Sequence, residues 1–311
     1  MIFSFGSKKM ITNKIGFIGL GNMGGRMARC LVNAGIEVLG YDASLGRSES
    51  VGATSAASIK EITQNCNYIF LSLPDSNVVE KVCEGDDGLL QHCRAGQVVV
   101  DLSTSAASST KRLNNLFKSK GVQLIDAGIS GGAAAAEKGT LTLMVGGDAL
   151  TIRDLEWAFN PISSKVFNMG ESGAGHTAKL LNNFLNAVSL AATAEVMVAG
   201  KKAGLDLNIL LDVLNSSSGV NFATLNRFPH IVNGNYLEGG LTGKLMTKDV
   251  VLYVDLVREL GIASLNASGP LASFGLQTAL GYGDLISNKV VDAIGDVSGG
   301  IRVHKEFGEQ K

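Results

Sequence analysis

Short apolar runs alternate with longer segments of helical pattern in the first half of the chain. The runs are nearly continuous in hydrophobicity, as expected for parallel strands that are buried on both faces. They cover residues 15–18, 36–41, 68–73, 98–101, 122–126 and 141–145. The alternation predicts an α/β fold, a doubly wound N-terminal domain that extends to about residue 173.

The pattern changes after residue 173, where apolar residues recur at helical spacing and no strand-like alternation remains. The first such segment, residues 177–203, reads as one long helix that joins the two halves of the chain, and Gly204 follows it as a stop signal. Four further segments have helical patterns, at residues 207–214, 245–260, 270–280 and 290–295. We therefore predict an all-helical C-terminal domain.

A glycine turn joins the first predicted strand to the first predicted helix. Gly19 permits a tight turn, Gly21 lets the backbone approach a pyrophosphate, and Gly24 lets the helix pack close to the strand. The helix N-terminus would then face the phosphates with free N–H groups. The turn is predicted to bind a dinucleotide through the residues Gly19, Leu20, Gly21, Asn22, Met23 and Gly24. The alternative is a glycine-rich loop that only turns the chain.

Asp42 ends the second apolar run, 18 residues beyond Gly24, where a dinucleotide site needs a carboxylate for the ribose 2′-OH. A carboxylate repels a 2′-phosphate, so Asp42 favours NAD as the cofactor. Ser44 and Arg47 could both meet a phosphate, so NADP stays open. With this site the N-terminal domain is predicted to be of Rossmann type.

Two further strand ends carry candidate cofactor contacts. Leu73 and Pro74 follow one run, and Ser103 and Thr104 follow another. Ligands of such sheets gather beyond the carboxyl ends of the strands. The alternative for Pro74 and Thr104 is that they only form the loop after each strand and contact no ligand. The domains are therefore predicted as residues 1–13, an N-terminal extension; 14–173, a dinucleotide-binding domain; and 174–311, a helical substrate and dimerisation domain.

Hydride transfer from a hydroxyl-bearing carbon needs a group that takes the hydroxyl proton. Lys179 is our candidate because it lies in the first turns of the long helix, with Asn183 one turn further on the same face. Partial desolvation would lower the pKa of the lysine, and the amide could hold the lysine or the substrate oxygen in place. A solvated helix face is the alternative.

Two other motifs could take part in the reaction. Ser130, Gly131 and Gly132 follow a strand and offer backbone N–H donors that could bind a carboxylate; the alternative is a flexible loop. Lys248 and Asp249 interrupt an apolar stretch; the alternative there is an exposed charge pair on a helix.

Composition narrows the function classes. The 311 residues are 45% hydrophobic and carry a formal net charge of −1, with Lys+Arg 27 against Asp+Glu 28, which disfavours nucleic acid and anionic membrane as partners. No apolar run approaches the ~20 residues of a membrane span. The four cysteines have no CxxC spacing and the four histidines are scattered, so we expect a cytoplasmic protein with reduced thiols and no metal site.

In its ordered motifs, from about Lys14 to Lys305, the chain resembles the β-hydroxyacid dehydrogenase family. These are the glycine turn, Asp101–Thr104 with Ser130–Gly132 and Gly139–Gly147, Gly173–Gly175 with Lys179 and Asn182–Asn183, and Lys248–Asp249.

The resemblance implies an NAD(P)-dependent oxidoreductase that reversibly oxidises a small 3-hydroxy acid to its semialdehyde or keto acid. Lys179 resembles the catalytic acid/base and Asn183 its supporting amide, while Ser130 to Gly132 match a loop for the substrate carboxylate. Leu73, Pro74, Thr104 and Lys248 match positions that contact the cofactor or close over it. The alternatives are an imine reductase-like enzyme, which Lys179 disfavours, and a non-catalytic dinucleotide-binding protein.

Substrate choice is expected to depend on the helical domain, and four residues are candidates to line a side-chain pocket: Asn221, Arg227, Leu241 and Lys244. An added cation there would indicate a second carboxylate or a phosphate on the substrate. The long apolar helices also suggest an extensive subunit contact, so we expect a homodimer or homotetramer.

Overall fold

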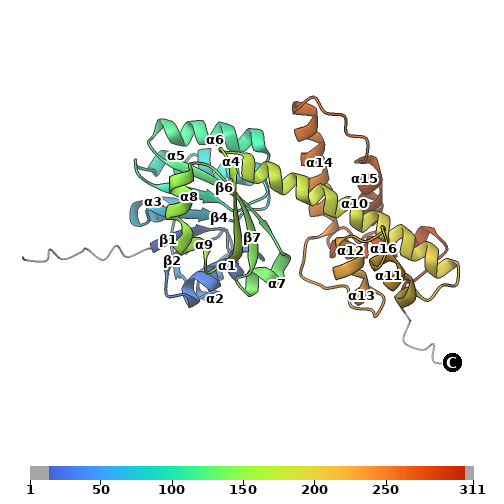
Figure 1. Ribbon diagram of the computed structural model, residues 1–311. Helices are drawn as coiled ribbons and strands as arrows, with labels where there is room; N and C mark the ends of the chain where they lie inside the picture. The colour runs from blue at the N-terminus through green and yellow to red at the C-terminus, as the bar shows by residue number, and fades with distance from the viewer. Residues whose placement is uncertain (1–13, 305–311) are drawn as a thin grey trace, which may run out of the picture. The chain divides into compact units, whose positions relative to one another are not determined.

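The computed structural model describes residues 14–304, which divide into two compact units (Figure 1). The first unit takes residues 14–103 and 108–174, and the second takes 104–107 and 175–304. The predicted N-terminal extension, residues 1–13, lies outside the described residues. The functions assigned to the domains 14–173 and 174–311 stay predictions.

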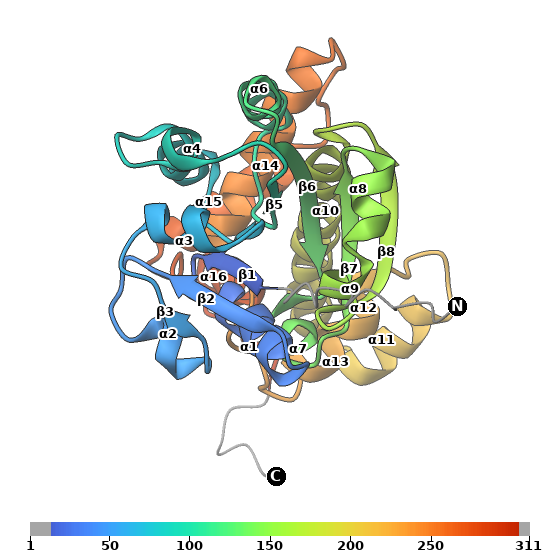
Figure 2. The ribbon, with the colours of Figure 1, turned by 90° about the vertical axis from the view of Figure 1, so that its left-hand side faces the viewer.

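One eight-stranded sheet forms the centre of the first unit, with β1 to β3 in blue and β6 to β8 in green (Figure 2). Its strand order is β3-β2-β1-β4-β5-β6-β7-β8, and every neighbouring pair is parallel except β6 with β7. The strands are β1 (Lys14–Ile18), β2 (Glu37–Tyr41), β3 (Thr54–Ser55), β4 (Tyr68–Leu71), β5 (Val98–Asp101), β6 (Gln123–Ser130), β7 (Leu141–Gly146) and β8 (Ser163–Gly170).

Successive residues of the central strands are buried in two different apolar clusters. Phe17 of β1 and Phe70 of β4 pack in one cluster, whereas their neighbours Ile18 and Leu71 pack in the other. Side chains alternate between the two faces of a strand, so both faces of the sheet are covered. This explains why the strands read as continuous apolar runs.

Nine helices accompany the sheet in the described part of the first unit. They are α1 (Gly24–Asn33), α2 (Arg47–Ser50), α3 (Ile59–Asn65), α4 (Ser76–Glu84), α5 (Leu89–His92), α6 (Ala107–Ser119, begun by the last residue of 104–107), α7 (Gly132–Glu137), α8 (Ala149–Asp154) and α9 (Glu156–Phe159). The predicted α/β fold class is confirmed.

The last strands of the sheet differ from the sequence prediction. The connection from β6 to β7 holds only the short helix α7 and is too short for a parallel crossover, which takes a dozen or more residues, so the two strands pair antiparallel. β8 lies at the edge of the sheet and exposes most of its side chains. Its polar start, Ser163-Ser-Lys165, gave no buried-strand signal, and the sequence prediction missed it.

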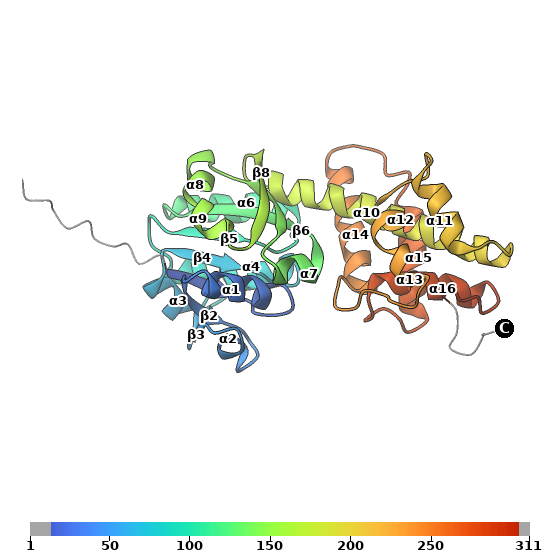
Figure 3. The same cartoon turned by 60° about the horizontal axis from the view of Figure 1, so that its bottom comes forward.

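The described part of the second unit is helical, as predicted, apart from one isolated bridge between Thr242 and Ile286. Helices α11 to α16 gather about the C-terminal part of α10 (Figure 3). The helices are α10 (Ala174–Lys202), α11 (Leu207–Asn215), α12 (Phe222–Asn226), α13 (Phe228–Ile231), α14 (Gly243–Glu259), α15 (Ser268–Ala279), the 3₁₀ turn η1 (Ser287–Lys289) and α16 (Val290–Val297).

Close packing explains a glycine inside α10. Gly200 is buried, and a Cβ built there would lie 2.5 Å from the Leu210 side chain. The glycine therefore lets α10 approach its neighbour, which offsets its low helix propensity.

No helix within residues 14–304 is long and apolar enough to cross a bilayer.

Candidate active site

The glycine turn between β1 and α1 has the geometry that its sequence predicts. Gly19 adopts a φ of +90°, and a Cβ there would lie 2.3 Å from the Ser72 carbonyl oxygen. A Cβ on Gly24 would lie 2.0 Å from the carbonyl oxygen of Gly19. A side chain at either position would clash with the backbone, so both positions strongly favour glycine.

Gly21 differs from these two glycines. A Cβ built there meets no protein atom within 4 Å, and its φ is not positive. The fold itself does not require a glycine at this position. A cofactor that approaches the backbone closely does require one, so the turn fits a dinucleotide.

Asp42 follows β2 and is held against the glycine turn. Its Oδ2 accepts a hydrogen bond from the Leu20 backbone N–H at 2.6 Å, and its Oδ1 accepts from the Ser44 N–H at 2.8 Å. These bonds fix the orientation of the carboxylate. Asn22 and Met23 complete the turn, where the Asn22 carbonyl accepts from Arg26.

The ends of β4 and β5 are tied together by Ser103, which the sequence placed with Thr104 among the candidate contacts at the strand ends. The buried Ser103 Oγ accepts from the Leu73 N–H at 2.9 Å, and its own N–H donates to Asp101 Oδ1 at 2.9 Å. These bonds fix the segment that begins with Leu73 and Pro74. Thr104 directly follows Ser103 and belongs to the second unit.

Ser130 is the last residue of β6, and α7 begins at Gly132. Gly131 and Gly132 both have positive φ, +128° and +70°, and both are exposed. The alanines after them form α7 rather than a flexible loop. The segment therefore presents a serine and two glycines at a fixed strand end.

Lys179 is nearly buried on α10, with 9% of its surface exposed. Burial lowers the pKa of this lysine to about 8; the carboxylate of Asp249 opposes that shift, and the ammonium of Lys248 adds to it. A lysine with such a pKa exchanges protons readily near neutral pH.

A polar chain connects α10 to α14 beside Lys179. The Asn183 amide donates to Asp249 Oδ2 and accepts at its own oxygen from Asn182 Nδ2 at 3.2 Å. Asp249 is 1% exposed, and its Oδ1 lies 3.2 Å from Lys248 Nζ. The 248–249 pair is therefore not an exposed charge pair.

Two more contacts within the second unit lie close to these hydrogen bonds. Lys248 Nζ lies 3.5 Å from the Thr104 carbonyl oxygen, to which it donates. Phe184 and Tyr253 stack with 3.7 Å between ring centroids and fix α10 against α14 next to the Asn183–Asp249 bond. The sequence prediction did not assign Asp249 a role, although a carboxylate within an apolar stretch was its signal.

The four pocket candidates of the helical unit have different environments. Asn221 caps α12, Lys244 pairs with Asp284 at 2.7 Å on the surface, and Leu241 packs on the helical core. Arg227 donates to side-chain oxygens of the same unit. Within residues 14–304, no group of three histidine, cysteine or acidic side chains could hold a metal ion.

Two family models match the chain. One is described as the NAD-binding domain of 6-phosphogluconate dehydrogenase and matches residues 14–170. The other is described as the NAD-binding region of NADP-dependent 3-hydroxyisobutyrate dehydrogenase and matches residues 173–275. Together they span most of both units.

Several characterised proteins are similar over most of their length. A 2-(hydroxymethyl)glutarate dehydrogenase of Eubacterium barkeri is 34% identical over 79% of this chain and 83% of its own. An NAD-dependent L-serine dehydrogenase of Pseudomonas aeruginosa is 34% identical over 87% and 94%. Among solved structures, a Mycobacterium tuberculosis 3-hydroxyisobutyrate dehydrogenase with L-serine has a TM-score of 0.82 and 30% identity, over 91% of this chain and 99% of its own.

Proposed function

The chain belongs to the β-hydroxyacid dehydrogenase family, and on that premise we propose how its residues divide the work of oxidising a small 3-hydroxy acid. It is an NAD(P)-dependent oxidoreductase that acts on a hydroxyl-bearing carbon. The observation that carries the assignment of residues is the nearly buried Lys179 beside the Asn183–Asp249 bond.

Lys179 is the acid/base in this proposal. A bound nicotinamide would supply the hydride acceptor. Lys179 Nζ, in its neutral form, takes the proton of the substrate hydroxyl during oxidation and returns it during reduction. Its pKa of about 8 supports this role, because both protonation states are populated near physiological pH.

Asn183 positions the reacting oxygen or the lysine. Its amide is oriented from both sides, by Asp249 and by Asn182. An oriented amide requires little reorganisation when the substrate binds, and such positioning is worth several kcal/mol of barrier, about 7–11 kcal/mol at its limit.

Ser130, Gly131 and Gly132 bind the substrate carboxylate in this proposal. The serine hydroxyl and the backbone N–H groups of two exposed glycines supply donors for an anion. The fixed end of β6 supports this role, because it presents these donors in one place.

The cofactor contacts come from the glycine turn, 19–24, with Asp42, Leu73, Pro74, Thr104 and Lys248. We propose NAD rather than NADP as the cofactor. The oriented carboxylate of Asp42 would accept the ribose 2′-OH and repel a 2′-phosphate, which supports the choice.

The subunits assemble as a homodimer or homotetramer in this proposal. A row of apolar residues on α11, Ile209 and Val213 with Leu205 before it, is more than half exposed, and exposed apolar patches of this kind mark interfaces. A light-scattering mass equal to one chain at micromolar concentration would exclude the oligomer.

The protein is cytoplasmic in this proposal. Its four free cysteines support this location, because thiols stay reduced there.

A substrate panel tests the function directly. The wild-type protein and the variant Lys179→Met are assayed with 3-hydroxyisobutyrate, glycerate, serine, threonate and 4-hydroxybutyrate, each with NAD and with NADP. We expect the variant to retain cofactor binding but lose at least 100-fold in kcat, the scale of a general acid/base. The matched control is Lys201→Met on the same helix, which should keep wild-type kcat. Full activity in Lys179→Met would overturn the role of the lysine.

A further inference from the structure

The guanidinium of Arg227, in the helical unit, has only neutral partners. One terminal nitrogen donates to Asn288 Oδ1 at 2.7 Å and, at 3.5 Å, to Ser287 Oγ. The other donates to Asn186 Oδ1 at 3.0 Å. Within residues 14–304 no carboxylate pairs with it, and its Nε–H has no acceptor there.

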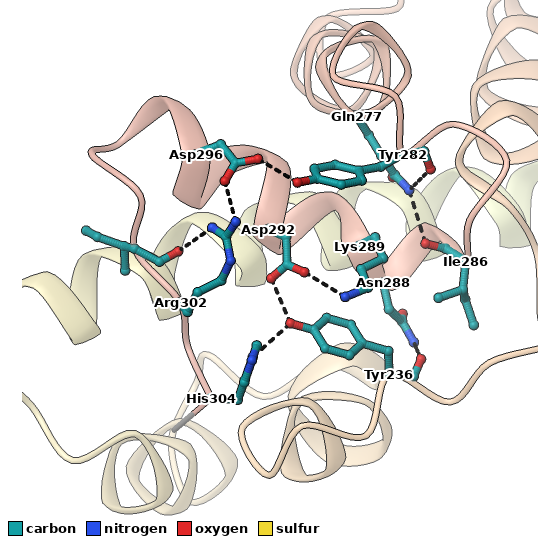
Figure 4. A network of polar contacts seen from close by, with 11 residues as sticks. Tyr236, Gln277, Tyr282, Ile286, Asn288, Lys289, Asp292, Asp296, Arg302 and His304 are labelled. Carbon is teal, nitrogen blue, oxygen red and sulfur yellow. Dashed lines mark hydrogen bonds and ion pairs between the residues drawn. The ribbon is translucent and has the colours of Figure 1, made fainter. Parts of the chain in front are cut away.

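Two other cations of the same unit are paired with carboxylates. Arg302 lies 2.6 Å from Asp296, and Lys289 lies 2.8 Å from Asp292, in the network of Figure 4. Both of these cations therefore have a counter-charge within the helical unit. Arg227 lacks one.

The missing counter-charge has an energetic cost because Arg227 is partly buried. Burial alone lowers the pKa of this arginine to about 10. A cation withdrawn from water without an anion is unfavourable, and proteins normally pair such groups. An anion that reached the unused N–H donors would offset the cost.

Asn186 places this guanidinium on the functional face of α10. It follows Asn183 by three residues and Lys179 by seven, so the three side chains share one helix face. At 1.5 Å per residue, Asn186 lies about 10 Å along the helix axis from Lys179. The guanidinium donates to the Asn186 side chain, so along the helix axis it is displaced by about 10 Å from the proposed acid/base.

We propose that Arg227 binds a second anionic group of the substrate, a carboxylate at the far end of a hydroxy diacid. The inference rests on the proposed function and names the substrate class of that same site. Arg227 is then a specificity-determining residue. It gains two charge-assisted hydrogen bonds with a diacid that a monoacid cannot make.

A binding measurement tests the anion site without turnover. Glutarate, butyrate and inorganic phosphate are added at equal ionic strength to the wild type, to Arg227→Gln and to Asn186→Asp, and Tm is recorded. We expect glutarate to raise the Tm of the wild type more than butyrate does, and both substitutions to remove the difference. Asn186→Asp keeps the arginine and gives it an internal counter-charge, so it tests the site even if Arg227→Gln fails to fold.

Turnover then tests specificity. Diacids that carry a 2-(hydroxymethyl) group, in a series of increasing chain length, are compared with 3-hydroxyisobutyrate as substrates. In the wild type, kcat/KM should be higher for the diacids, so the ratio of the two values should exceed one. This ratio should fall about 10- to 100-fold in Arg227→Gln and Asn186→Asp. The matched control is Arg94→Gln, since Arg94 also has neutral partners, Thr63 and Asn67, but is exposed. It should leave the ratio unchanged.

The outcomes are distinct. A larger Tm shift with phosphate than with glutarate, lost in both variants, supports the anion site and overturns the carboxylate as its occupant. Equal shifts with glutarate and butyrate in the wild type, or an unchanged kcat/KM ratio in folded variants, overturn the inference. A wild type that oxidises no hydroxy acid but still binds glutarate through Arg227 overturns the proposed function alone.

Discussion

Asn183 on α10 donates its amide hydrogen to Asp249 on α14, and the carboxylate that accepts it is 1% exposed. The same carboxylate raises the pKa of Lys179, against the effect of burial. One acidic side chain therefore orients the amide and tunes the lysine.

The first prediction concerns pH. Lys179 acts as a base in oxidation, so kcat/KM for oxidation should rise with pH to a plateau above its pKa of about 8, and kcat/KM for reduction should fall over the same range. Initial rates in both directions from pH 6 to 10 check this. A flat oxidation profile through pH 8 would contradict the assignment.

Stability provides a second readout for the same lysine. Its pKa in the folded protein is about 8, below the ordinary lysine pKa of 10.5, so the fold disfavours the charged form. The penalty is fully present below pH 8 and disappears as pH rises toward 10.5. At pH 7 the variant Lys179→Met should therefore be more stable than the wild type, by an amount on the order of 3 kcal/mol at most. Urea unfolding at pH 7 and pH 10 measures the difference, which should shrink at the higher pH.

Asp249→Asn should move the pH profile in a defined direction. Removing the carboxylate withdraws the effect that raises the pKa of Lys179, so the oxidation midpoint should shift below the wild-type value. The control is Asp255→Asn, on the same helix but paired with Arg258 at the surface. A loss of kcat without any shift of the midpoint would show that Asp249 serves structure alone.

Two glycines of the same turn should respond differently to alanine. Gly24→Ala places a Cβ 2.0 Å from the Gly19 carbonyl oxygen. It should therefore lower the free energy of unfolding by about 2 kcal/mol or more. Gly21→Ala meets no protein atom within 4 Å, so its Tm should stay near that of the wild type while its Kd for the cofactor rises. Thermal unfolding and cofactor titration separate the two effects. Unchanged cofactor binding in Gly21→Ala would argue against a dinucleotide at this turn.

Cofactor choice should depend on Asp42. Asp42→Asn removes the charge that would repel a 2′-phosphate, so the ratio of kcat/KM with NAD to kcat/KM with NADP should fall at least tenfold, about 1.4 kcal/mol. Glu49→Gln, an exposed carboxylate in the next helix, is the control. A wild type that already prefers NADP would overturn the proposal for NAD.

Local sequence signals predict most of the fold because they coincide with burial. The continuous run at 98–101 is a strand buried on both faces, and the helical pattern of residues 177–203 marks the long helix α10. β8 carries no such signal because it lies at an exposed edge. The reversed direction of β7 depends on the length of a connection, which a residue pattern does not report.

The candidate site divides in the same way. Residues in contiguous motifs, such as the glycine turn, could be predicted from spacing alone. Asp249 and Ser103 act through partners distant in sequence, Asn183 and Leu73, so their roles emerge only when the chain is folded. The same holds for Arg227, whose missing counter-charge is a property of its neighbours.

The second unit takes the four residues 104–107 out of the middle of the first, and Lys248 donates to the carbonyl oxygen of one of them, Thr104. The two units therefore do not correspond to two uninterrupted stretches of sequence. Recombination at a single crossover near residue 174 would join a new helical unit to the old 104–107 segment. An exchange of the whole helical unit would therefore have to carry both segments, 104–107 and 175–304, together.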